Sequence, residues 1–294
     1  MSARIVVGSR ESQLAVAQSM TVVSFLKAAH PEIDVALLTM KTTGDRILDR
    51  TLDKVGGKGL FVKELDVALC QRRADIAVHS LKDMPMDVPE TLPILCCSCR
   101  EDPRDALVLR PGVQTRPDLI VGTSSLRRAI QLKALFPNWE IRPVRGNLQT
   151  RLRKLDEGQF DALVLAAAGL KRLGLEDRVS RYFGVDEIIP ATGQGIMAVQ
   201  GRADFDRTLL EGYADGDAWC AATAERAFVR ELDGGCTSPV CAHAVPDGES
   251  IRITGLYYEA SDGSWRKGAV EGHREAAERL GIELARTLRD GRVV

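Results

Sequence analysis

The 294-residue sequence lacks an excess of charge of either sign, a long hydrophobic run and a signal sequence. It contains 40 basic and 41 acidic residues, so its formal net charge is −1. A net charge near zero gives no general attraction to nucleic acid or to a membrane surface. No apolar run approaches the roughly 20 residues of a membrane span, and the N-terminus lacks the apolar core of a signal peptide. We therefore expect a cytoplasmic protein without nucleic-acid or membrane partners.

The seven cysteines lack the spacing of a metal site. Cysteines without a secretory signal indicate a reducing compartment and free thiols. Cys96, Cys97 and Cys99 lie close together in a strand pattern, but no second Cys/His pair follows at ligand spacing. Free cysteine is often a small core residue, so we predict no metal site. A metal-binding regulator built on these three residues is a distant alternative.

A stretch of 36 residues, Leu119–Lys154, holds the clearest functional signal. A short apolar run ends at Gly122, and hydroxyl side chains and a helix pattern follow it. The hydroxyls and the first arginines of this helix are Thr123, Ser124, Ser125, Arg127 and Arg128. A strand that leads into a helix in this way presents free N–H groups and a helix dipole, which attract an anion.

The same layout follows a second time within this stretch. Trp139–Val144 is predicted to be a strand, and Arg145-Gly146-Asn147 opens a helix that carries Arg151 and Arg153. Arginine suits bidentate capture of carboxylate or phosphate, so several arginines at strand–helix junctions indicate a polyanionic ligand. The alternative is a solvated basic helix face. The glycines and hydroxyls at the junctions favour the ligand, because a solvated face does not need them.

The N-terminal third of the chain resembles this stretch, which indicates an internal repeat. RIVVGSRESQLA resembles LIVGTSSLRRAI, HPEIDVALLTM resembles FPNWEIRPV, and RRADIAVHSLKD resembles GQFDALVLAAAGLKR. In the first copy Arg4–Val7 is a strand, residues 8–12 are a turn and a helix begins at Gln13. The repeat predicts two α/β domains of similar build. Because such sheets bind ligands at the carboxyl ends of their strands, the two domains would present two anion-binding edges to a shared cleft.

The predicted domain boundaries follow from this repeat. The first α/β domain covers 1–98, and the chain returns to it at about 196–215 through a glycine-rich hinge at 191–195. The second covers 99–195. Residues 216–294 form a small α+β domain with a helix at Asp217–Leu232, three strands and a final helix. Residues 41–59 form a long loop rich in Gly, Lys and Asp. Its GGKG lacks the spacing of a phosphate-binding P-loop, and we predict that the loop is mobile and functional.

Eleven motifs along the chain together resemble the porphobilinogen deaminase (hydroxymethylbilane synthase) family. In order they are VGSRESQLA, TTGD, VGGKGLFVKEL, DIAVHSLKDMP, REDPRDA, VGTSSLRRA, VRGNLQTRLRKLD, AGLKRLG, ATGQG, TAERAF and GGCTSP. The resemblance implies three domains, the first two built like the halves of a type II periplasmic binding protein. It also implies a transferase of tetrapyrrole (haem) biosynthesis. This enzyme would join four porphobilinogen molecules head to tail, releasing an ammonia from each, and water would free hydroxymethylbilane.

The resemblance further implies a dipyrromethane cofactor, held by a thioether to Cys236. This cysteine follows two glycines and precedes Thr-Ser-Pro, so it lies on a tight loop where a thiol could be exposed. The residues implied for holding the rest of the cofactor are Lys82, Thr123, Ser124, Ser125, Arg127, Arg128 and Arg145. From spacing alone, a loop thiol without a role is the stronger interpretation of Cys236.

The implied catalytic group is the carboxylate of Asp83. Loss of ammonia leaves an electrophilic azafulvene whose positive charge spreads onto the pyrrole nitrogen, and a nearby carboxylate would stabilise that charge. The residues implied for binding substrate are Arg10, Ser12, Arg151, Arg172 and Gln194. Without the resemblance, Asp83 would be a turn acid before Pro85. The main competing function is a non-catalytic anion-binding protein of the periplasmic type, which needs neither Cys236 nor Asp83. We also expect a monomer.

Overall fold

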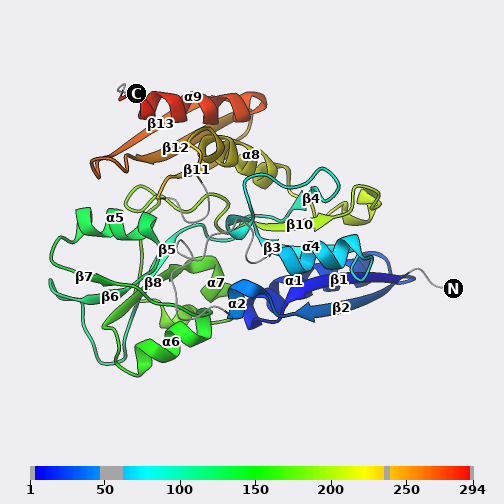
Figure 1. Ribbon diagram of the computed structural model, residues 1–294, viewed down its shortest axis with the longest axis horizontal. Helices are drawn as coiled ribbons and strands as arrows, with labels where there is room; N and C mark the ends of the chain where they lie inside the picture. The colour runs from blue at the N-terminus through cyan, green and yellow to red at the C-terminus, as the bar shows by residue number, and fades with distance from the viewer. Residues whose placement is uncertain (1–3, 47–61, 235–238, 292–294) are drawn as a thin grey trace. The chain divides into compact units, whose positions relative to one another are not determined.

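The computed structural model describes residues 4–46, 62–234 and 239–291 (Figure 1). The chain divides into two compact units. Unit 1 comprises Met1–Glu101 and Ile196–Trp219, and unit 2 comprises Asp102–Gly195 and Cys220–Val294. The division into three domains, with 216–294 as a separate piece, stays a prediction.

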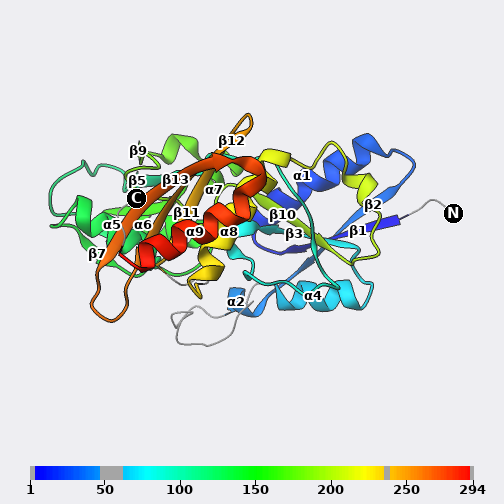
Figure 2. The ribbon, with the colours of Figure 1, turned by 90° about the horizontal axis from the view of Figure 1, so that it is seen from above.

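Unit 1 is a five-stranded mixed sheet between helices. Its strands are β1 (Arg4–Arg10), β2 (Asp34–Met40), β3 (Ile76–Ser80), β4 (Ile94–Cys97) and β10 (Met197–Gly201). Its helices include α1 (Gln13–Ala29), α2 (Thr43–Arg46) and α4 (Lys63–Cys70). The strand order is β2-β1-β3-β10-β4, with β10 antiparallel to both of its neighbours. One apolar cluster packs beneath α1 and another beneath α4, and Figure 2 shows these helices on opposite sides of the sheet.

Unit 2 contains a second five-stranded sheet with the corresponding order, β7-β6-β8-β5-β9. Its strands are β5 (Asp105–Leu109), β6 (Ile120–Gly122), β7 (Glu140–Arg142), β8 (Ala162–Ala166) and β9 (Arg181–Tyr182). The helices between them are α5 (Leu126–Leu135), α6 (Leu148–Asp156) and α7 (Ala167–Arg172). Strand β6 is parallel to β7 and β8, whereas β5 is antiparallel to β8 and β9. The two sheets therefore share one topology, and the predicted pair of similar α/β folds is confirmed.

Equivalent aspartates make equivalent bonds in the two copies of the repeat. The Val6 amide donates to Asp75 Oδ2 at 2.8 Å, and the Ile120 amide donates to Asp161 Oδ2 at 3.0 Å. The backbone amides of the two aspartates donate in return to the carbonyls of Val6 and Ile120. Asp75 fixes β1 beside β3, and Asp161 fixes β6 beside β8, so the repeat is one of structure as well as of sequence.

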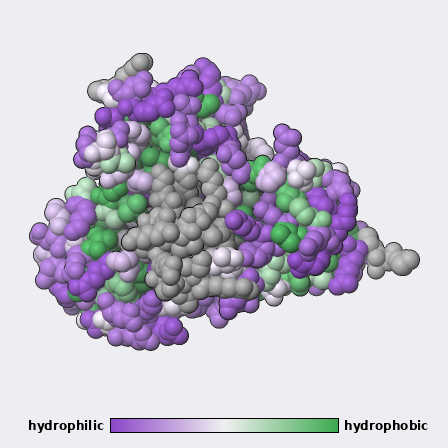
Figure 3. Space-filling model, viewed as in Figure 1, coloured by the Kyte–Doolittle hydropathy of each residue, from purple (hydrophilic) through white to green (hydrophobic). Residues whose placement is uncertain are grey.

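The C-terminal part of unit 2 is a three-stranded antiparallel sheet packed on two helices. The strands are β11 (Cys241–Asp247), β12 (Ser250–Tyr258) and β13 (Trp265–His273), and the helices are α8 (Gly216–Glu231) and α9 (Ala277–Arg289). Gly255 of β12 has no Cβ because one built there would lie 2.6 Å from the Phe228 ring of α8. The outward face of α9 is mainly hydrophilic (Figure 3). The predicted α+β tail is confirmed.

Some predicted boundaries shift for identifiable reasons. The strand expected at Trp139–Val144 spans only Glu140–Arg142, and it ends before Pro143, which has no N–H to donate to a sheet. The turn expected at 8–12 begins later, because β1 continues to Arg10 opposite Met40. The predicted loop 41–59 begins with the helical turn α2, and its remainder lies outside the described residues.

Candidate active site

The cationic edge of unit 2 is formed where strands of its five-stranded sheet end. The parallel strands β6, β7 and β8 all finish at this edge. Strand β5 runs the other way, so its first residue, Asp105, lies here opposite Ala166. Helices α5 and α6 begin at the same edge, capped by the side chains of Ser125 and Asn147. This is the strand–helix arrangement that the sequence predicts.

Asp105 holds both arginines of the first turn of α5. Arg127 Nη1 donates to Asp105 Oδ2 at 2.8 Å and to the Ile189 carbonyl at 2.7 Å. Arg128 donates to Asp105 Oδ1 from Nη2 at 2.7 Å and from Nε at 3.1 Å, and to the Val164 carbonyl from Nη1. One carboxylate thus serves two guanidinium groups, and the trio keeps one positive charge.

Burial decides between the two interpretations of these arginines. Arg127 is 4% exposed, Arg128 is 6% exposed and Asp105 is fully buried, so a solvated basic face is wrong for this turn of the helix. Burial by itself would raise the pKa of Asp105. The charges and hydrogen bonds of Arg127 and Arg128 outweigh that effect and hold the pKa well below its usual range.

The hydroxyl cluster shapes the loop between β6 and α5. Ser124 Oγ donates to the Val144 carbonyl at 2.7 Å and accepts from the Val144 amide at 3.0 Å. Serine has a single O–H donor, and Ser124 uses it in this bond, so its predicted contact with the cofactor stays a prediction. Ser125 Oγ accepts from the Arg128 amide as the helix N-cap, so its O–H is not used by that bond. Thr123 Oγ1 accepts from the Ser125 amide and is buried.

The other predicted arginines of unit 2 lie around the same edge and are half-buried. Arg151 Nε donates to the Gly146 carbonyl at 2.8 Å, next to Arg145. Gly146 has a φ of 112°, which favours glycine and turns the chain into α6. Arg172, in the last turn of α7, donates from Nη2 to the Gly195 carbonyl at 2.6 Å.

Gln194, which is predicted to bind substrate, lies beside the start of β5, and its role in substrate binding stays a prediction. It is 1% exposed, and Nε2 donates to the Pro103 carbonyl at 2.7 Å and to Asp105 Oδ1 at 2.9 Å. Its amide nitrogen therefore holds the start of β5 rather than pointing to solvent. The flanking Gly193 and Gly195 have φ values of 73° and 91°, as the glycine-rich sequence predicts. Whether this segment acts as a hinge stays a prediction.

The corresponding edge of unit 1 contains the predicted catalytic carboxylate. Asp83 ends a short 3₁₀ helix, Leu81–Asp83, directly after β3, and it is half-buried. Lys82 precedes it, and Arg10 ends the neighbouring strand β1. Ser12 caps α1 by accepting from the Ala15 amide at 3.3 Å. Within the described residues, no hydrogen bond or ion pair engages the Asp83 carboxylate, which leaves both of its oxygens for a ligand.

His79 lies in β3 of the same sheet, four residues before Asp83, and is 5% exposed. Burial lowers its pKa to about 4, the Gln200 side chain opposes this and the charge of Arg10 adds to it. The imidazole is therefore neutral in the folded protein at neutral pH.

This lowered pKa predicts an acid-dependent loss of stability. Between about pH 6.5 and pH 4 His79 is protonated in the unfolded chain but not in the folded protein. The free energy of unfolding therefore falls as the pH falls through this window. The loss should reach roughly 2–3 kcal/mol. Urea titrations at several pH values across the window give the free energy of unfolding at each pH. Plotted against pH, this free energy should change less steeply for His79→Gln than for wild type. An equal slope in the two proteins would contradict the assignment.

Two of the described cysteines, Cys96 and Cys241, have thiols less acidic than a cofactor attachment site requires. Cys236 lies outside the described residues. Cys241, at the start of β11, is 1% exposed, and burial raises the pKa of its thiol to about 12. Burial also raises the pKa of Cys96 to about 12. Such thiols do not form thiolates at neutral pH, so Cys96 and Cys241 are core residues.

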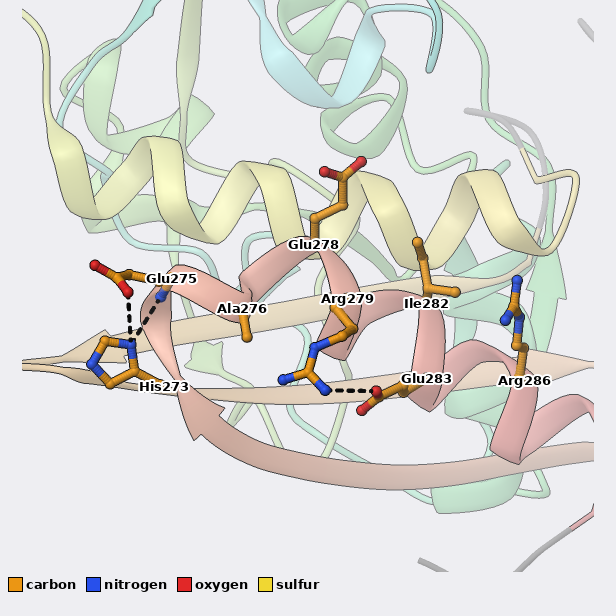
Figure 4. Close-up of a pocket in the computed structure, with 8 residues that line it drawn as sticks. All are labelled: His273, Glu275, Ala276, Glu278, Arg279, Ile282, Glu283 and Arg286. Carbon is orange, nitrogen blue, oxygen red and sulfur yellow. Dashed lines mark hydrogen bonds and ion pairs between the residues drawn. The ribbon is translucent and has the colours of Figure 1, made fainter.

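A surface groove along α9, of about 850 Å³, does not resemble an active site (Figure 4). Four of its polar side chains form two pairs: Arg279 Nη1 donates to Glu283 at 3.2 Å, and His273 Nδ1 lies 3.8 Å from Glu275 Oε2. Each of these four side chains is at least 49% exposed, so the pairs are solvated.

Sequence reasoning did not select Asp105. The available signal was an acid that opens a strand directly after Arg104, within REDPRDA, in a chain whose next helix begins with two arginines. An acid at a buried strand end needs a counter-charge. The pairing of Asp105 with Arg127 and Arg128 depends on the antiparallel register of β5, which the sequence pattern does not reveal.

The fold and these contacts define an α/β protein with a cationic sheet edge built around one buried carboxylate. Two family models match the chain. The porphobilinogen deaminase model of the dipyrromethane cofactor binding domain matches residues 5–210, and that of the porphobilinogen deaminase C-terminal domain matches residues 219–290. The chain therefore belongs to the porphobilinogen deaminase family, and the predicted resemblance is confirmed.

Named relatives agree with this placement. Porphobilinogen deaminase of Ruminiclostridium cellulolyticum is 52% identical and aligns over 97% of each chain. Porphobilinogen deaminase of Acetivibrio thermocellus is 51% identical, over 98% of this chain and 99% of that one. The structure of the methionine-binding protein MetQ is 12% identical and covers 74% of this chain and 92% of its own, with a TM-score of 0.45; a likeness this slight supports no argument.

A membrane-spanning segment would need a long apolar helix. None of the helices in the described parts of the chain meets that requirement.

Proposed function

We propose that the chain deaminates porphobilinogen and joins four molecules of it head to tail into hydroxymethylbilane, on a dipyrromethane cofactor bound to Cys236. The observation that supports this most directly is the match to both porphobilinogen deaminase domains over residues 5–210 and 219–290. A non-catalytic anion-binding protein is disfavoured, because relatives with half of their residues identical are porphobilinogen deaminases. Cytoplasmic location and a monomeric state belong to the same proposal.

The residues of unit 2 suit a ligand that carries several carboxylates. Porphobilinogen has an acetate and a propionate, so each pyrrole unit brings two negative charges. Asp105 neutralises only one of the two guanidinium groups that it holds. The half-buried Arg145, Arg151 and Arg172 add positive charge at the same edge. We assign the cofactor's carboxylates to Arg127, Arg128 and Arg145, with the Ser125 hydroxyl as a further donor.

The cofactor, the arginines and Asp83 have different roles in the proposed reaction. When bound, the dipyrromethane supplies the primer to which the first substrate is joined. The arginines and Lys82 bind and orient carboxylates through charge-assisted hydrogen bonds. Asp83 stabilises the positive charge that develops on the pyrrole nitrogen as ammonia leaves. Arg10 and Ser12, at the same edge of unit 1 as Asp83, bind substrate in this proposal.

Intact mass under denaturing conditions tests the cofactor assignment. We expect the wild-type chain to be heavier than its sequence by two linked pyrrole units, and peptide mapping should place them on Cys236. Cys236→Ser should lose most of the adduct and of the activity.

Cys241→Ser is the matched control, since this buried thiol lies five residues further along the chain and is not a thiolate at neutral pH. It should keep the adduct. An active wild-type protein with Cys236 unmodified would remove the cofactor assignment.

A further inference from the structure

Glu225 is a buried carboxylate of α8 that joins two segments far apart in sequence. It is fully buried, and Oε2 accepts from the Gly193 amide at 2.6 Å. Oε1 accepts from the Ala244 amide of β11 at 2.8 Å. The three participants come from a loop, a helix and a strand, so this side chain fixes three backbone segments at one point.

Neighbouring contacts reinforce the junction. The Ala242 amide donates to Thr192 Oγ1 at 3.3 Å, one residue before Gly193. His243 Nδ1 lies 3.6 Å from Glu225 Oε1, and the imidazole is 6% exposed. The start of β11 is therefore held to the 192–193 segment at two alternate amides, by Ala242 directly through Thr192 and by Ala244 through Glu225.

The two segments lead to different parts of the candidate site. Gly193 precedes Gln194, whose amide holds Asp105, and Asp105 holds Arg127 and Arg128. On the other side, α8 ends at Glu231 and β11 begins at Cys241, so these elements flank the part of the sequence that contains Cys236. Glu225 belongs to the first of these elements and bonds to the second.

We propose that Glu225 is a positioning residue: its carboxylate holds the helix and strand that flank the Cys236 segment in register with the Gln194–Asp105–arginine network. This inference rests on the function proposed above. Glu225 contacts neither substrate nor cofactor in it. A carboxylate is suited to the role because each of its two oxygens accepts one backbone N–H, which a neutral side chain of the same size cannot do.

Glu225→Gln is the principal test, because it keeps the shape and replaces one acceptor oxygen with an NH₂ group that faces an N–H donor. Hydrogen exchange of peptides that contain Gly193 and Ala244 should become at least about ten-fold faster in one or both, since a buried donor loses its partner. Turnover per adduct-bearing chain should fall about ten-fold or more, with a smaller change in KM. The fraction of chains that carry the adduct should also fall.

Glu231→Gln is the matched control on the same helix. Glu231 is half-buried and pairs with Arg286 and Arg289 of α9, away from the junction. We expect exchange at Gly193 and Ala244, adduct loading and turnover all to match wild type. If Glu225→Gln does not fold, Thr192→Val removes one acceptor of the same junction, and we expect a two-fold to ten-fold effect in the same direction.

The possible outcomes distinguish a positioning role of Glu225 from a purely structural one. Faster exchange at Gly193 or Ala244 with unchanged loading and turnover would show a bond of structural value only and would overturn the proposal. Unchanged exchange would overturn it as well. A wild-type protein without adduct or activity would instead overturn the proposed function, and the exchange measurement would then still report on the junction itself.

Discussion

Replacing Asp83 with asparagine should lower turnover at least roughly 100-fold, the scale observed when one preorganised electrostatic group is removed. Asparagine keeps the size of the side chain and the 3₁₀ turn at Leu81–Asp83 but removes the charge. A carboxylate that opposes a developing cation acts mainly in the transition state, so kcat should fall far more than substrate affinity. Steady-state kinetics on fully loaded protein measures both quantities.

Control variants distinguish a catalytic role of Asp83 from a purely structural role in the turn before Pro85. Asp83→Glu should retain part of the activity, because the charge survives with a different reach. Glu90→Gln, at an exposed acid of the same unit, should leave turnover unchanged. If Asp83→Asn turns over normally and only unfolds at a lower temperature, the catalytic carboxylate lies elsewhere. Asp45 would then be the next acid to test.

Replacing Asp105 with asparagine should have the largest effect on stability. The substitution leaves two buried guanidinium groups without their counter-charge. Removing one partner of a buried ion pair typically costs about 3–5 kcal/mol, because the remaining charge stays desolvated. Urea denaturation of the whole chain, followed by tryptophan fluorescence, should show a loss of this size. The fraction of chains that carry the cofactor should also fall, since Arg127 and Arg128 lose their fixed orientation.

The matched control is Asp118→Asn, which breaks the solvated pair of Asp118 with Arg116. Asp118 is 76% exposed, and such pairs contribute at most about 1 kcal/mol. A loss at Asp105 no larger than that at Asp118 would contradict the interpretation of Asp105, Arg127 and Arg128 as a buried ionic trio.

The lowered pKa of Asp105 also determines how its contribution to stability changes with pH. The pKa of Asp105 is lowered by the arginines, so its stabilisation is complete above about pH 4, the ordinary value, and is lost as the pH falls toward the lowered pKa.

The sequence by itself determined the elements and their repetition, because those signals are local. An apolar run, a glycine and a hydroxyl before a helix pattern occur twice, and the structure has Ser12 and Ser125 as the N-caps of equivalent helices. The ordered motifs also determined the family. The end of β7 at Arg142 is also local in origin, because Pro143 has no N–H to donate, although the apolar pattern predicted a strand up to Val144.

Only the tertiary structure decided which partners the polar side chains take. The sequence placed arginines at a strand–helix junction, but Asp105 reaches them through the antiparallel pairing of β5 with β8. That same packing pairs Gln194 with Asp105 and Ser124 with Val144, two internal hydrogen bonds that the sequence pattern does not reveal. A buried hydrogen bond depends on register between segments that are distant in the chain, and a one-residue change of register would turn each side chain to the other face. The residue type specifies whether a side chain can donate or accept a hydrogen bond, and the fold determines which group becomes its partner.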